Sequence, residues 1–212
     1  DMGDPLATRG KARTVLTCVA KGLPGSKKNP VLMSLENAAL KFIYVLLHVV
    51  NINDHSINLM KEEIEKCNEE YDGLDTMCGE RYGLWDMQGW CEDRDIEFTA
   101  IFPNYDRQKS AFNYLYDVLR EGRFKSPKVH IVGSKKDDIL REELGVFDHD
   151  MDKRWFGSQE KQEKYGIQDD IIYALGWDMY GCKEKGPADF RIRKSITNFG
   201  ILYENKHLLG VY

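Results

Sequence analysis

The 212-residue chain has few cysteines, no long apolar run and no excess of basic charge. Its five cysteines include no Cys-x-x-Cys pair and form no regular framework, which favours reduced, mostly buried thiols in a cytosolic setting. The longest apolar run, residues 43–50, is interrupted by His48 and is too short to cross a bilayer. We therefore expect no membrane-spanning segment.

The overall charge is slightly acidic, with 30 Lys and Arg against 35 Asp and Glu and a formal net charge of −5. Proteins that merely coat nucleic acid are usually basic, so the total does not suggest nucleic-acid binding. A carboxylate cluster that holds metal ions would lower the charge and still permit a basic rim. The chain opens on Asp1 with neither a starting Met nor a secretory signal, so we expect a fragment of a longer protein.

The composition, 42% hydrophobic and 31% charged, is that of one large globular domain with at most a modest appendage. Apolar patterns predict strands at 14–20, 41–50, 74–80, 96–102 and 129–132. They predict helices at 56–73, 84–93, 107–120, 137–144 and 171–181, and a helix-like insertion at 31–40. Residues 150–165 are polar and predict a hairpin or a mobile loop. This order indicates an α/β domain with a mixed sheet.

Acidic residues stand at the ends of these predicted elements. Asp4 precedes the first predicted strand, Glu80 ends a short strand, and Asp169 and Asp170 open a helix. Ligands of α/β sheets bind beside the strand carboxyl ends, and carboxylates there suit hard cations such as Mg²⁺. Each acid also has an ordinary explanation, since an Asp that starts a helix is the favoured N-cap. Only the joint placement favours a metal site.

Four motifs, in this order, resemble the nuclease domain of the large terminase subunit of tailed phages, the motor protein that packages DNA. The matching segments are Asp4-Pro5 before a basic loop and a strand, Gly79-Glu80, the basic patch that ends at Pro127, and Gly166-Ile167-Gln168-Asp169-Asp170 before a helix with Ala174-Leu175. The resemblance runs from Asp4 to about Tyr180. The chain departs from the family at Gln168, where a His is usual, and at Tyr173, where an Asp is frequent.

The resemblance implies an RNase H-like fold, with a mixed central sheet flanked by helices, over residues 1–181. Residues 182–212 would form a C-terminal extension docked on the domain or on a packaging partner. The resemblance also implies that Asp4, Glu80 and one or both of Asp169 and Asp170 are catalytic metal ligands for two Mg²⁺ or Mn²⁺ ions. Which residue of the Asp pair binds stays open.

The implied activity is metal-dependent endonucleolytic cleavage of double-stranded viral DNA during genome packaging, in the host cell cytoplasm. The implied partners are DNA, an N-terminal ATPase domain, a small terminase subunit and a portal protein. The chain itself has no Gly-x-x-x-x-Gly-Lys-[Ser/Thr] phosphate loop, so we expect it not to hydrolyse ATP. Two alternatives remain open: a Holliday-junction resolvase or integrase-like nuclease, and a catalytically silent docking module whose acids are helix caps.

Three further side chains carry weaker expectations. His48 lies inside an apolar strand and is predicted to be a hydrogen-bonded core histidine, and His149 is predicted to lie in a solvated acidic turn. Trp155 is flanked by Lys153 and Arg154, which makes it the one tryptophan expected to stack on DNA or contact its backbone.

Overall fold

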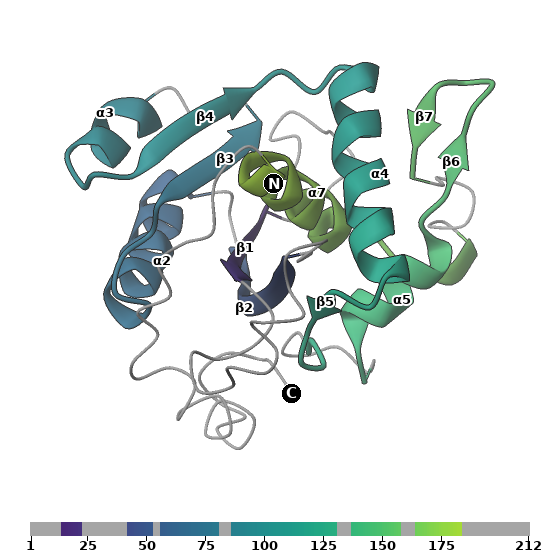
Figure 1. Cartoon of the computed structure of the whole chain (residues 1–212), viewed down its shortest axis with the longest axis horizontal. Coiled ribbons are helices and arrows are strands. Elements are labelled where there is room, and N and C mark those ends of the chain that lie inside the picture. Colours follow the sequence, from purple (N-terminus) through teal and green to yellow (C-terminus); the bar gives the residue numbers. More distant parts are fainter. Residues whose placement is uncertain are drawn as a thin grey trace, which may run out of the picture.

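The computed structural model describes residues 14–22, 42–52, 56–80, 86–130, 137–157 and 164–183. These residues form a mixed arrangement of strands and helices, drawn in Figure 1. The elements, in chain order, are β1 (Thr14–Gly22), β2 (Ile43–Ile52), α2 (Ile57–Glu70), β3 (Thr76–Glu80), α3 (Met87–Glu92), β4 (Glu97–Ile101), α4 (Tyr105–Arg120), β5 (Phe124–Lys125), α5 (Ile139–Val146), β6 (His149–Asp150), β7 (Trp155–Phe156) and α7 (Asp170–Lys183).

The described strands form several small sheets. β1 pairs antiparallel with β2, from Thr14 opposite Ile52 to Gly22 opposite Ile43, and β2 also pairs parallel with the short β5. This sheet, in the order β1-β2-β5, is therefore mixed. β3 and β4 form a separate parallel pair, and β6 and β7 form an antiparallel hairpin. The α/β class and a mixed sheet are thus confirmed.

The long elements lie where the apolar patterns predict them, and the hairpin expected within 150–165 is present as β6 and β7. Of the strand predicted at 129–132, Val129 makes an isolated bridge, and residues 131–132 lie outside the described residues. The short strand β5 was not predicted. A two-residue strand is defined by pairing with its neighbour β2, so no sequence period marks it. The insertion expected at 31–40, and the extension beyond Lys183, lie outside the described residues.

Helix α7 is the centre of the packing. Figure 1 shows it between β3 and α4, and it packs against both of these elements and against β1. It is buried around most of its circumference, as expected of a helix whose apolar residues do not keep to one face. A Cβ added to Gly176 would lie 2.6 Å from the ring of Phe112, so this glycine lets α4 approach α7 closely.

β1 runs in the same direction as α7. Thr17 Oγ1 donates a hydrogen bond to Asp178 Oδ2 at 2.5 Å. Four residues further along both elements, Lys21 Nζ donates to the backbone carbonyl of Cys182 at 2.6 Å. The contacts of β1 therefore advance along α7 as the strand advances.

β3 runs in the opposite direction. Its last residue, Glu80, contacts Trp177, whereas Cys78 lies against Gly181, where an added Cβ would meet the Cys78 sulfur at 2.3 Å. The beginning of β1, the end of β3 and the beginning of α7 therefore lie at the same end of the molecule.

Candidate functional site

The described members of the predicted ligand set lie at this common end. Glu80 is the last residue of β3, Asp169 immediately precedes α7, and Asp170 is the first residue of α7. Asp4 lies outside the described residues.

Glu80 is held by a tryptophan. The indole Nε1–H of Trp177 donates to Oε1 of Glu80 at 3.1 Å. Burial raises the pKa of Glu80 above its ordinary value, and the indole hydrogen bond acts against that rise because it favours the ionised form. Glu80 is therefore a partly desolvated carboxylate with one fixed donor.

Asp169, directly before α7, lies on the same side of the helix as Tyr173 and Trp177. Asp169, Tyr173 and Trp177 are spaced four residues apart, which places them on one face of the N-terminal half of α7 and the residue before it. Burial raises the pKa of Tyr173, and the negative charges of Asp169 and Glu80 raise it further. Both carboxylates are thus near enough to act on one tyrosine hydroxyl.

Asp170 is placed differently. It is one residue further along, which turns it about 100° around the helix axis from Asp169. Its side chain is buried, with 8% exposed. Of the predicted pair, Asp169 is therefore the residue that shares a face with the Glu80 contact.

The capping role expected of an Asp at the helix start is performed by a residue from another helix. The backbone carbonyl of Asp169 accepts from Tyr173 N–H at 3.0 Å, which makes Asp169 the N-cap position. The amides of Ile171 and Ile172, which an N-cap side chain usually binds, donate to Oε2 of Glu143 at 2.9 and 3.3 Å. Glu143, on α5, is fully buried and so anchors the start of α7.

The donor set is compatible with a hard divalent cation. Within the described ranges, no three His, Cys, Asp or Glu side chains form a group able to hold a metal ion, and Asp4 lies outside those ranges. The residues present offer carboxylate oxygens, the ligands that Mg²⁺ and Mn²⁺ prefer. In addition, Oε1 of Gln168, directly before Asp169, is buried and has no hydrogen-bond partner among the described residues.

A cavity of about 540 Å³ lies between β1 and β3. Consecutive residues 16–21 of β1 and 76–78 of β3 line it. A strand face contributes only every second residue to a surface, so the edges of both strands, rather than their faces, border this space. Helices α2 and α7, the segment 71–75, Leu47, Arg94 and Asp95 contribute the rest of the lining, with Asp178 among the residues of α7. Burial raises the pKa of Asp178 to about 7.

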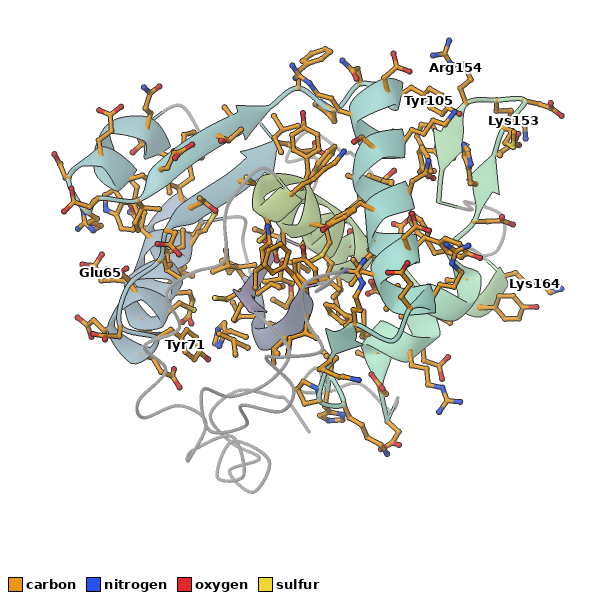
Figure 2. All side chains as sticks on the ribbon, viewed as in Figure 1. Glu65, Tyr71, Tyr105, Lys153, Arg154 and Lys164 are labelled. Carbon is orange, nitrogen blue, oxygen red and sulfur yellow. The ribbon has the colours of Figure 1, made fainter. Side chains whose placement is uncertain are left out.

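The hairpin of β6 and β7 carries an exposed basic tip. Figure 2 shows Lys153 and Arg154 projecting outward from it, beside Tyr105 of α4. The Trp155 side chain is 57% exposed, as a nucleic-acid contact would require, and Arg154 stacks over the Tyr105 ring at 4.5 Å. Nearby carboxylates offset this charge, since Lys153 pairs with Asp150 at 3.3 Å.

The two histidines considered in the sequence analysis, His48 and His149, both pack against other side chains of the fold. His48 is buried, as predicted, but neither ring nitrogen has a hydrogen-bond partner in the described part of the chain, and Glu63 Oε2 lies 3.6 Å from Nε2. Burial lowers the pKa of His48. His149 is in β6 rather than in a solvated turn: it stacks on Phe156 with ring centroids 4.1 Å apart.

Two residues of the candidate site, Trp177 and Glu143, are absent from the sequence-based predictions. Nothing in the sequence links Trp177 to Glu80. For Glu143 a signal is present, because it falls among Ile139, Leu140 and Val146 on the buried face of α5. An acid on an apolar helix face requires a hydrogen-bonded partner.

The chain matches no family model, no curated protein and no solved structure. None of the helices in the described segments is both long enough and apolar enough to span a membrane.

Proposed function

We propose that this chain is a metal-dependent endonuclease domain that cleaves double-stranded viral DNA during genome packaging, with an active site formed by Glu80, Asp169 and Asp4. The observation that carries the proposal is the hydrogen bond between Glu80 and Trp177, because Trp177 lies on the same face of α7 as Asp169. The carboxylates of Glu80 and Asp169 are 89 positions apart in the sequence and lie on different elements.

The direction of β1 supports the inclusion of Asp4. β1 begins at Thr14, at the same end of the molecule as Glu80 and Asp169. Asp4 is ten positions before Thr14, and ten extended residues span roughly 33 Å at most. Asp4 is therefore within reach of the other two carboxylates.

We propose that the fold is of the RNase H-like form, which has a mixed central sheet flanked by helices. The mixed sheet β1-β2-β5 supports this form.

In this proposal the carboxylates of Glu80, Asp169 and Asp4 hold two Mg²⁺ or Mn²⁺ ions. When bound, such ions lower the pKa of an attacking water and offset charge on the leaving oxygen of a phosphodiester. Glu143 keeps Asp169 in place because it fixes the first turn of α7. The hairpin tip with Trp155 offers a surface for the DNA backbone or an unstacked base.

Mn²⁺-dependent nicking of supercoiled plasmid tests the assignment. Glu80→Gln, Asp169→Asn and Asp4→Asn should each lower the rate at least 100-fold, whereas Asp170→Asn should lower it less. Glu69→Gln, an exposed acid on α2, is the matched control and should nick at the wild-type rate. Thermal melting of each variant checks that the fold is retained.

Full activity in folded Glu80→Gln or Asp169→Asn would refute the active site. Cleavage of four-way junctions in strong preference to linear duplex would favour the resolvase alternative instead. Absence of Mg²⁺ and Mn²⁺ binding by calorimetry would favour the silent docking module.

A further inference from the structure

We propose that Trp177 is a positioning residue that orients the Glu80 carboxylate for cation binding, through the hydrogen bond from its indole N–H. This inference rests on the proposed function. It adds a residue that carries no charge and contacts neither DNA nor metal, and whose effect passes entirely through Glu80.

The indole itself has a fixed position. Trp177 is 1% exposed and belongs to a small buried cluster with Ile101 and Ala111. Its ring lies 6.3 Å from that of Phe112 and 6.2 Å from that of Tyr180, centroid to centroid. A side chain enclosed in this way cannot change rotamer without disturbing the core. The N–H therefore points at Glu80 from a rigid base.

The carboxylate, in contrast, depends on this contact for its orientation. A glutamate side chain has several rotatable bonds to order, and the Trp177 hydrogen bond restricts them. Trp offers only a donor, so it binds a carboxylate oxygen and never competes for the cation. Oε1 of Glu80 is thereby held 3.1 Å from the indole nitrogen, which restricts the orientation of the carboxylate.

A purely structural role for the same bond makes a different prediction. A buried indole N–H needs an acceptor, and Glu80 could simply meet that need. In that case loss of the N–H would change stability alone. If Trp177 positions Glu80, its loss also weakens cation binding and slows the chemical step, while binding of DNA is unchanged.

The decisive variant replaces Trp177 with 3-benzothienylalanine, which keeps the ring shape and substitutes sulfur for the N–H. Trp177→Phe is a second, genetically simpler variant in case the first fails to fold. 5-Fluorotryptophan at position 177 retains the donor and serves as the rescue. Trp90→Phe, at a half-buried tryptophan on α3 that stacks on Arg94, controls for loss of an indole elsewhere.

Two quantities are measured on the full chain: Mn²⁺ affinity, from the electron paramagnetic resonance signal of free Mn²⁺, and kcat and KM for plasmid nicking. We expect the benzothienyl variant to bind Mn²⁺ about tenfold more weakly and to nick with a kcat about tenfold lower, with KM for DNA unchanged. The fluorotryptophan and Trp90→Phe proteins should match the wild type.

Unchanged Mn²⁺ affinity in the folded benzothienyl variant would overturn the positioning role. If the wild type binds Mn²⁺ in a manner that depends on the N–H but does not cleave DNA, the proposed nuclease function fails and the positioning role stands. If the wild type binds no Mn²⁺, both fail.

Discussion

Replacement of Glu143 should detach the start of α7 from α5 and destabilise the whole domain. Glu143 is fully buried and its Oε2 accepts from the amides of Ile171 and Ile172. In Glu143→Ala both amides lose this acceptor inside the protein, at roughly 1–3 kcal/mol for each unsatisfied group. We therefore expect a loss of about 2–6 kcal/mol in the free energy of unfolding.

A loss of that size lowers Tm by about 5–15 °C in a domain of this length, which differential scanning calorimetry resolves easily. Glu143→Gln keeps an amide oxygen at the same place and should lose about half as much or less. Glu142→Ala removes an exposed neighbouring carboxylate from the same helix and should change the free energy of unfolding by no more than about 0.5 kcal/mol.

Amide hydrogen exchange shows which part of the chain loses stability in Glu143→Ala. The amides of Ile171 and Ile172 should exchange much faster in Glu143→Ala, since they become the weakest part of α7. Equal destabilisation by Glu143→Ala and Glu142→Ala, or unchanged exchange at the two amides, would refute the reasoning. Either result would mean that the start of α7 is held by other contacts.

Two further predictions concern the packing around α7. Gly176→Ala should cost about 1–3 kcal/mol in urea unfolding, because the new methyl group would meet the Phe112 ring, whereas Gly145→Ala, in open space on α5, should stabilise by up to about 1 kcal/mol. The pKa of Asp178 is raised to about 7 in the folded chain, so its contribution to stability is present at pH 4 and is lost as the pH rises through 7. Asp178→Asn should flatten this dependence, whose slope is at most about 1.4 kcal/mol per pH unit for one proton, and should keep an acceptor for Thr17. An unchanged slope in the variant would contradict the assignment to Asp178.

Much of the fold follows from local patterns. β1 and β2 are β-branched and apolar, and both were predicted within two or three residues of their observed ends. Helix α2 begins at its Ser56 cap and buries Met60, Ile64 and Cys67 at helical spacing. These elements can be predicted because each buries one face, so that apolar residues recur at the spacing of a helix or a strand along the sequence.

Local sequence patterns predict only part of the proposed active site. The sequence places Glu80 at a strand end and Asp169 and Asp170 at a helix start, because flanking residues define those ends. It could not choose between the two aspartates. That choice depends on which face of α7 meets β3, and the contact of Trp177 with Glu80 is the observation on which we base the proposal of Asp169.

The sequence by itself therefore determined the order of strands and helices, the α/β class and the ends at which the acids stand, since all of these rest on the spacing of neighbouring residues. Only the tertiary structure decided that β1 and β3 run in opposite directions along α7, that Glu143 caps a helix 27 positions away, and that Trp177 holds Glu80. The physical reason is that such contacts join distant segments, and their geometry is set by how the helices and sheets pack rather than by any local period.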